Sequence, residues 1–426
     1  MSIDIFNERE SDVRSYCRSF PAVFTTARGA TLWDETGRSW IDFLAGAGAL
    51  NYGHNHPEIR SRLIEHLESD AISHGLDLHT ATKRRFLETF ERVVLAPRNM
   101  PHKVQFTGPT GANAVEAALK IARKATGRTG VVAFMGGYHG MSLGALAVTS
   151  NAESRAGAGV SMGDVTFAPF PGGPTGHIDS LAWIRMLCQD SHSGMALPAA
   201  IIVEPVQAEG GVNVAPRQWL QGLRALCDEY AIVLIMDEIQ TGCGRTGPFL
   251  AAEHADVMAD VITLSKSISG YGLPMSLVLM RPELDLWKPA EHNGTFRGNQ
   301  MAFVAGTAAL ELFETLDVPA LVEAAGLVVS DFVSKEILPL DPGIELRGIG
   351  LMWGIDMAST GQGATSLASD IARRCYHAGL VIERCGRGDT VLKVLPPLTI
   401  ATEELVLGLS ILRDAIAAEL AVEVQP

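Results

Sequence analysis

Short apolar runs alternate with amphipathic helical patterns through the middle of this 426-residue chain, and this alternation restricts its fold more than any other feature. Continuous apolar runs of this kind are typical of strands that are buried on both faces of a sheet. Helices are predicted near 113–126 and 216–230, between or beside strands predicted at 104–106, 131–135, 200–204, 232–237, 261–264 and 277–280. The alternation predicts an α/β domain with a mainly parallel sheet.

The pattern changes before about residue 55 and after about residue 310, where helices predicted at 307–316, 365–378 and 403–420 surround short strands. We therefore expect residues 56–309 to form a large domain. Residues 1–55 and 310–426 are expected to build a smaller α+β domain together. The length of the chain suits two or three domains.

Composition excludes several classes of protein. Hydrophobic residues make up 47% of the chain and the net charge is −14, which indicates a globular protein that repels nucleic acids and anionic membranes. Six cysteines without CxxC spacing predict reduced thiols and no zinc site made of cysteines alone. The acidic segment 1–10 has no apolar run, so we expect no secretory signal peptide and a cytoplasmic protein.

A long stretch without Asp, Glu, Lys or Arg lies between Arg128 and Glu153. It is long enough to cross a bilayer, but five glycines and His139 interrupt it. We expect two buried strands joined by a loop instead.

Polar residues follow several of the predicted strands, and ligands of parallel α/β sheets bind at the carboxyl ends of strands. Residues 107–112 (Thr-Gly-Pro-Thr-Gly-Ala) precede a helix and could hold a phosphate at its N-terminus. Tyr138 lies on a glycine-flanked loop and could stack on a planar ligand. The plain alternatives are a capped turn and a loop residue packed on the core.

Two charged residues also end predicted strands. Asp237 ends an apolar strand, where a buried salt bridge is the structural alternative. Lys266 follows another strand, and a partly buried lysine suits a Schiff base, whereas a surface lysine needs no function. Residues 242–247 match GxGxxG, but Pro248 follows them and no helix begins there, so dinucleotide binding is not favoured.

Together these features match the needs of pyridoxal phosphate. That cofactor takes an amine for an imine, an anion beside the pyridinium nitrogen, a phosphate cup and a stacking ring. Each feature is weak alone, but the predicted sheet would bring all four to equivalent strand ends.

The chain resembles the class III (ornithine- and acetylornithine-type) aminotransferases of fold type I over nearly its whole length. The matching segments lie at 32–37, 51–57, 137–140, 204–207, 237–242, 265–266, 294–299 and 347–351. The resemblance implies that Lys266 forms the imine and moves the proton, and that Asp237 binds the pyridinium nitrogen. It places the other cofactor contacts at Gln240 near the phenolic oxygen, Tyr138 on the ring, Thr110, Gly111 and Ala112 at the phosphate, and Thr295 from the neighbouring subunit of a homodimer or larger oligomer.

Within the class, residues 74–80, 105–111, 264–274 and 291–299 are most similar to the diaminobutyrate–2-oxoglutarate aminotransferases, which act at the start of ectoine synthesis. Two positions depart from the class pattern. Lys393 stands where many members have a carboxylate-binding arginine, and Ala208 precedes Glu209 where a glycine is usual. By resemblance, Glu209 and Lys393 contact substrate. Another diamine, ω-amino acid or aldehyde substrate, an aminomutase or decarboxylase reaction, and a non-catalytic binding protein remain alternatives. A protein without catalysis would be expected to have lost Lys266 or Asp237.

Overall fold

The computed structural model describes residues 3–361 and 363–423, so Met1 and Ser2 of the acidic N-terminal segment lie outside it. Its centre is a seven-stranded sheet, which is parallel except that β12 runs antiparallel to both of its neighbours. The α/β class and the mainly parallel sheet predicted from the sequence are thus confirmed. In spatial order the strands are β4 (Lys103–Gly108), β12 (Ser276–Met280), β11 (Val261–Leu264), β10 (Val233–Asp237), β7 (Ala200–Val203), β5 (Val131–Phe134) and β6 (Val165–Ala168).

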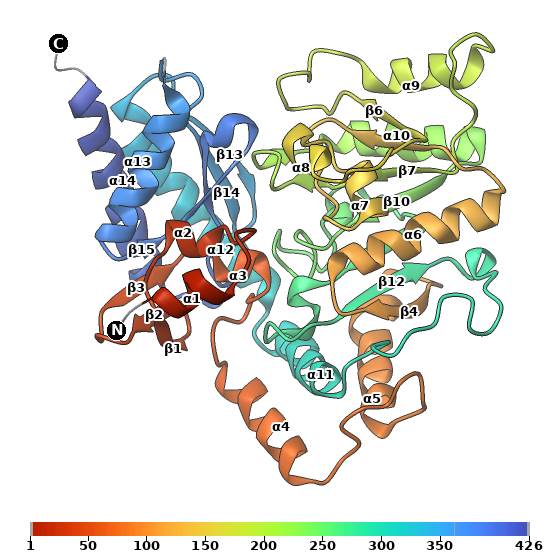
Figure 1. Cartoon of the computed structure of the whole chain (residues 1–426), viewed down its shortest axis with the longest axis horizontal. Helices are drawn as coiled ribbons and strands as arrows, with labels where there is room; N and C mark the ends of the chain where they lie inside the picture. Colours follow the sequence, from red (N-terminus) through yellow and green to blue (C-terminus); the bar gives the residue numbers. More distant parts are fainter. Residues whose placement is uncertain (1–2, 362, 424–426) are drawn as a thin grey trace.

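Helices cover both faces of this sheet (Figure 1). Alternate strand residues point to opposite faces, so Ile202 and Ile235 pack with α6 (Gly111–Thr126) and α7 (Leu143–Val148). Ile201 and Leu234 belong to the larger core on the other face, with residues of α5 (Ala81–Phe90), α10 (Arg217–Tyr230) and α11 (Gln300–Thr315). Burial on both faces explains why these strands are continuously apolar.

The two ends of the chain meet in smaller sheets, which lie together on the left of Figure 1. One sheet has the order β1 (Phe24–Arg28), β2 (Thr31–Asp34), β3 (Ser39–Asp42) and β15 (Leu380–Val381), with β15 parallel to β3. The other has the order β13 (Glu345–Ile349), β14 (Met352–Asp356), β17 (Val391–Val394) and β16 (Glu383–Cys385). The pairing of β3 with β15 supports the division at residues 55 and 310 that we propose.

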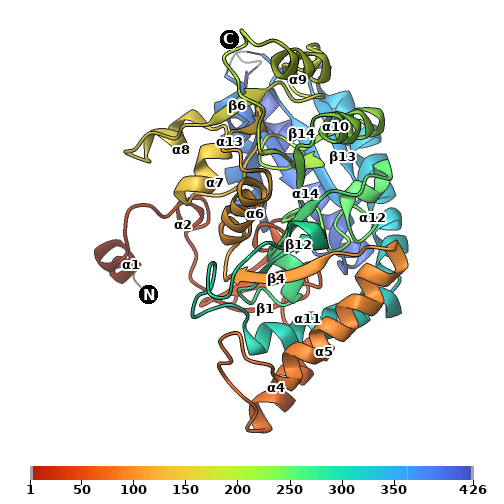
Figure 2. The same cartoon turned by 90° about the vertical axis from the view of Figure 1, so that its right-hand side faces the viewer.

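The other elements connect these layers. Figure 2 shows α5 and α11 packed side by side next to α4 at the foot of the molecule, and α1 standing apart from the main body. The helices not yet named are α1 (Asp4–Arg9), α2 (Tyr16–Ser19), α3 (Ala45–Gly48), α4 (Pro57–Glu68), α8 (Ala152–Ala156), α9 (Ser180–Gln189), α12 (Val318–Phe332), α13 (Ala364–His377) and α14 (Thr402–Glu423), and β8 (Val206–Gln207) pairs with β9 (Asn213–Val214).

One expectation for the charge-free stretch is wrong. Its first half forms β5, but its second half forms the helix α7 instead of a strand. Glu116 of α6 accepts hydrogen bonds from the backbone amides of Gly144 and Ala145 at 2.8 and 3.3 Å. A carboxylate at these first-turn amides stabilises a helix start, and it comes from a distant part of the chain. Among the described residues, no helix is long and apolar enough to cross a membrane.

Candidate active site

The carboxyl ends of β4, β5, β7, β10 and β11 lie at one edge of the central sheet and surround a cavity of about 250 Å³. Nearly all the residues expected from the sequence line this cavity. They are Thr110, Gly111, Ala112, Tyr138, Glu209, Asp237, Gln240 and Lys266. Lys393 lies behind Glu209, and Thr295 belongs to a separate surface segment.

Lys266 directly follows β11 and Ser265, and it begins a short 3-10 helix, Lys266–Ser269. Its φ of +46° is unusual for a residue with a side chain, and such strain is typical of functional positions. Burial lowers the pKa of the Lys266 amine, which favours the neutral, nucleophilic form. The amine has no hydrogen bond or ion pair within residues 3–361 and 363–423, so it is free to react.

Asp237 ends β10 and is held by three donors. His139 Nδ1 lies 2.7 Å from its Oδ2, while the Thr263 hydroxyl and the Ile239 amide donate to Oδ1 at 3.0 and 3.1 Å. Burial opposes a charge on His139, but the hydrogen bond and charge of Asp237 outweigh it and raise the pKa of the imidazole. The sequence analysis did not assign a role to His139, although its place beside Tyr138 in a glycine-flanked loop was a usable signal.

Tyr138 and Glu204 lie at the same edge of the sheet as Asp237, and a hydrogen bond joins them. The Tyr138 amide donates to Glu204 Oε1 at 2.9 Å, which fixes the loop that carries the tyrosine ring. Burial raises the pKa of Glu204 to about 8 against the opposing charge of His139, so this carboxyl group holds a proton at neutral pH. Tyr138 remains 38% exposed towards the cavity, as a ring that stacks on a planar ligand must be.

The N-terminus of α6 opens into the cavity at Thr110 and Gly111. The first amides of a helix have no intrahelical acceptor and attract anions. Asn113 Oδ1 accepts from both the amide and the hydroxyl of Thr110, at 3.2 and 2.9 Å, and so fixes the turn. A Cβ at Gly111 would lie 2.9 Å from Cδ1 of Ile239, so any larger residue would require that side chain to shift.

A chain of polar contacts runs from this cavity to the N-terminal segment. Gln240 Nε2 donates to Glu209 Oε1 at 3.2 Å, and Lys393 Nζ donates to the same oxygen at 2.6 Å. Lys393 also pairs with Glu383 at 2.9 Å, and the hydroxyl of Tyr16 donates to Glu383 at 2.8 Å. The sequence predicted the Lys393–Glu209 neighbourhood, but it missed Glu383 and Tyr16.

The charged groups in this network of contacts shift one another's pKa values. Burial alone would raise the pKa of Glu209, but Lys393 and Lys266 lower it to about 2. Burial also opposes the charge of Lys393, whose pKa the two glutamates raise. Lys393 is therefore a buried cation between two carboxylates. A charge in a protein interior needs such partners of opposite charge.

Thr295 does not line the cavity in its own chain. It is exposed, and the adjacent Phe296 is 63% exposed and contacts His74 with ring centroids 5.3 Å apart. The segments around residues 74–79 and 291–299 thus form one surface, joined also by a 3.3 Å hydrogen bond from Asn293 to Asp77.

The cavity fits pyridoxal phosphate on its own geometry. It holds a free amine at Lys266, a carboxylate at Asp237, an exposed ring at Tyr138 and a helix N-terminus at Thr110. Among the described residues, Gln240 Oε1 is buried without a hydrogen-bond partner, as expected of a group that faces a bound cofactor. Residues from separate strands converge here in the four roles that the cofactor needs.

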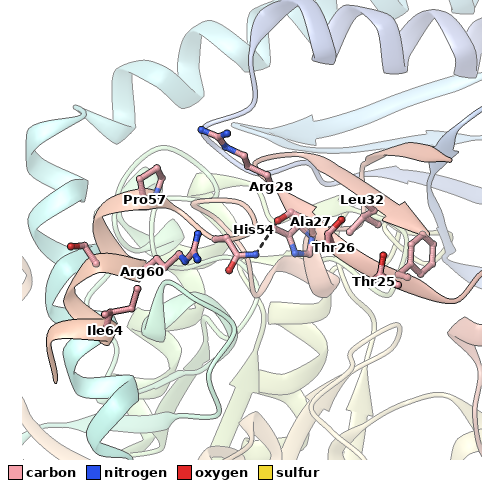
Figure 3. A pocket seen from close by; sticks show the side chains of 12 residues that line it. Thr25, Thr26, Ala27, Arg28, Leu32, His54, Pro57, Arg60 and Ile64 are labelled. Carbon is pink, nitrogen blue, oxygen red and sulfur yellow. Dashed lines mark hydrogen bonds between the residues drawn. The ribbon is translucent and has the colours of Figure 1, made fainter. Parts of the chain in front are cut away.

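A larger hollow of about 950 Å³ lies between β1 and α4, away from these residues. Figure 3 shows Arg28, His54 and Arg60 around it. None of the residues expected to bind cofactor lines it, so its size does not mark the active site.

Known proteins resemble this chain over nearly its whole length. The Aminotransferase class-III family matches residues 14–416. The chain is 50% identical to a diaminobutyrate–2-oxoglutarate transaminase of Bordetella parapertussis over 99% of this chain and 97% of that protein. It is 51% identical to one of Nocardia farcinica, with 97% and 94% covered.

A solved structure of the ornithine aminotransferase from Toxoplasma gondii, described as having partial occupancy of pyridoxal phosphate at its active site, superposes with a TM-score of 0.86. It is 27% identical, and the match covers 99% of this chain and 95% of that one. The resemblance inferred from the motifs is thereby confirmed, and the chain belongs to the class III aminotransferases, with pyridoxal phosphate as its cofactor.

Proposed function

We propose that this aminotransferase interconverts L-glutamate plus L-aspartate 4-semialdehyde with 2-oxoglutarate plus L-2,4-diaminobutyrate. The observation that carries the proposal is the 50–51% identity, over nearly the full length, to proteins named for this reaction. In its metabolic setting the reaction would be the first step of ectoine synthesis in the cytoplasm.

Each active-site residue has a role in the proposal. Bound pyridoxal phosphate supplies an aldehyde that condenses with amines and a ring that stores the electron pair released beside the nitrogen. Lys266 would hold the cofactor and would then move the proton between the amine-bearing carbon of the substrate and the cofactor. Asp237, oriented by His139, keeps the pyridine nitrogen protonated, while Gln240 lies near the phenolic oxygen.

The remaining cofactor contacts come from the loops at the strand ends. Tyr138 covers the ring, and the first turn of α6 at Thr110, Gly111 and Ala112 binds the phosphate. The buried neutral carboxyl of Glu204 positions the Tyr138 loop without adding a second negative charge beside Asp237.

We also propose a homodimer, or a larger oligomer, in which Thr295 completes the phosphate site of the neighbouring subunit. Thr295 lies on an exposed surface with apolar side chains at Leu76, Leu78 and Phe296, which are 48%, 58% and 63% exposed. The helix α1 has no buried residue and exposes Ile5 and Phe6. Exposed apolar side chains that gather on one surface are typical of protein interfaces.

Product analysis tests the reaction. The purified holoenzyme is incubated with L-glutamate and, separately, with aspartate 4-semialdehyde, glutamate 5-semialdehyde and succinate semialdehyde, and the products are identified by mass spectrometry. Diaminobutyrate is expected as the preferred product. Preferred amination of either other aldehyde would contradict the substrate assignment, and isomerisation of an amino acid without glutamate would instead indicate an aminomutase.

A further inference from the structure

A second cavity of about 900 Å³ adjoins the active-site cavity, and Tyr138 and Glu209 line both. Its far side is formed by the segment that begins in β16 and continues towards β17. This segment places two cations, Arg384 and Arg387, along the cavity. Since the two cavities share Tyr138 and Glu209, a group that projects from the active-site cavity past Tyr138 faces the cavity that these arginines line.

Both arginines are available to bind an anion, whereas the nearby Lys393 is not. Lys393 is fully buried and already paired with Glu209 and Glu383. By contrast, neither Arg384 nor Arg387 has a side-chain hydrogen bond or ion pair anywhere in the described part of the chain. Glu153 and Asp389 line the same cavity, but neither forms an ion pair with an arginine there.

The backbone fixes this arginine segment relative to the active site. The Gly386 amide donates to the carbonyl of Glu209 at 2.9 Å, so the loop is attached to the residue that separates the two cavities. Gly386 and Gly388 have φ of +81° and +66°, a conformation that glycine adopts without strain. Glu383, at the start of the segment, is held by Tyr16 and Lys393.

The chemistry of the proposed substrates shows what such a pair of cations would bind. In glutamate, the side-chain carboxylate lies three carbon–carbon bonds from the carbon that carries the reacting amine. In diaminobutyrate reacting through its terminal amine, the only carboxylate lies at the same separation. One distal-carboxylate site can therefore serve both half-reactions, although the groups next to the reacting amine differ.

We propose that Arg384 and Arg387 form this distal-carboxylate site, and the proposal rests on the function proposed above. An arginine presents a planar fork of donors that matches a carboxylate and keeps its charge at any physiological pH. The site is then selective for amino donors and acceptors that end in a carboxylate three carbon–carbon bonds from the reacting carbon. Lys393 and Glu209 are left to contact the group beside the amine.

Substrate pairs that differ by one carboxylate test the proposal. Glutamate is compared with 2-aminobutyrate, and diaminobutyrate with 1,3-diaminopropane, in single-turnover reactions of the holoenzyme. The variants are Arg384→Gln, Arg387→Gln and their double variant, with Arg373→Gln on α13 as the matched control. In the double variant, kcat/KM is expected to fall by about 10- to 100-fold for glutamate and diaminobutyrate, mainly through KM.

The substrates without the distal carboxylate, 2-aminobutyrate and 1,3-diaminopropane, serve as internal controls. Their rates are expected to change by less than about twofold if only a carboxylate contact is lost. Arg→Lys variants are expected to restore part of the loss. Equal losses for both members of each pair, or no loss with glutamate, would overturn the proposal. If the wild type uses glutamate but not diaminobutyrate, the proposed function fails while the glutamate pair still tests the arginines.

A binding measurement keeps the test independent of turnover and of variant folding. Wild-type holoenzyme is titrated calorimetrically with glutarate and with butyrate, which differ by one carboxylate. Tighter binding of glutarate is expected, with the difference lost in the double variant. Equal affinity of the wild type for both acids would refute a distal-carboxylate site.

Discussion

His139 Nδ1 lies 2.7 Å from Asp237 Oδ2, and both side chains are buried beneath the cavity that fits the cofactor. The histidine orients the carboxylate, and the hydrogen bond and charge of Asp237 raise the pKa of the imidazole and so favour its charged form. Because Thr263 and Ile239 occupy the other oxygen, the position of Asp237 is fixed before any ligand binds.

We expect Asp237→Asn to keep binding the cofactor and to lower kcat by at least about 100-fold, because an amide cannot hold the ring nitrogen protonated. His139→Phe removes one hydrogen bond to a charged group, so a loss of about 10- to 100-fold is expected. His102→Asn, at a buried histidine that contacts Ala259 instead, is the control and should leave turnover nearly unchanged. Wild-type turnover of Asp237→Asn would refute the role of the carboxylate.

Lys266 is expected to carry the cofactor as an imine, since its amine is shielded from solvent, has no partner among the described residues and is held at the carboxyl end of β11. Borohydride reduction of the holoenzyme followed by peptide mapping should place the pyridoxyl label on Lys266. The Lys266→Ala variant should take up no label and show no turnover. A label on another lysine of the wild type would contradict the assignment.

Lys393 and Glu209 are expected to distinguish the two half-reactions. We propose that their 2.6 Å ion pair stays closed when diaminobutyrate binds, and that the carboxylate beside the amine of glutamate takes the place of Glu209. Lys393→Ala should therefore slow the glutamate half-reaction far more than the diaminobutyrate half-reaction, by about 10-fold or more. Glu209→Ala should let α-amino acids compete better, because the cation stays free.

Glu383 makes a control necessary, because loss of Lys393 leaves a second buried carboxylate unpaired. The double variant Lys393→Met/Glu383→Gln removes both charges and separates this cost from the effect on substrate. Equal losses in both half-reactions, together with a lower Tm, would show that the ion pair only braces the structure.

Thr295 is expected to act in the neighbouring subunit. Inactive Lys266→Ala and Thr295→Ala proteins are mixed and allowed to exchange subunits. In a hybrid dimer with shared sites, one site carries both changes and the other carries neither, so activity should return towards a quarter of the wild-type value. A mixture of each variant with itself is the control, and no recovery after proven exchange would rule out a shared site.

Much of this site could be predicted from the sequence because parallel sheets gather their strand ends. Asp237 and Lys266 stand at the ends of two apolar strands, and β10 pairs directly with β11. Local patterns therefore placed both residues at one edge without knowledge of their partners. The same logic located Tyr138 and the first turn of α6.

The contacts that the sequence could not reveal are tertiary ones. Glu383 reaches Lys393 because β16 and β17 are antiparallel neighbours in register, and Tyr16 joins them from the other end of the chain. The helix α7 was mistaken for a strand because its start depends on Glu116 of α6. In both cases the folded structure brings a charged group to its partner, and the spacing of the two residues in the sequence does not reveal the contact.

The glycines of the GxGxxG match have a structural role. A Cβ at Gly242 would lie 2.8 Å from the Glu238 carbonyl, and Gly244 has φ of +88°. These glycines let the chain turn tightly and bring Arg245 inside.

Arg245 should be a major determinant of stability. It is fully buried, and burial lowers its pKa to about 9, yet no carboxylate pairs with it among the described residues. It donates to the carbonyls of Leu351 and Pro396 and, at 2.7 Å, to Asn51 Oδ1. One side chain thus joins three distant segments between the central sheet and the smaller sheets.

We expect Arg245→Lys and Arg245→Met to lower the free energy of unfolding by about 2–4 kcal/mol each, because lysine cannot reach all three acceptors and methionine offers no donor. Arg373→Met, at an exposed arginine of α13, should change it by less than about 0.5 kcal/mol. Urea unfolding of the holoenzyme at one protein and cofactor concentration measures the difference. An unchanged midpoint for both Arg245 variants would mean that the three acceptors find other partners, and that the buried guanidinium contributes no net stability.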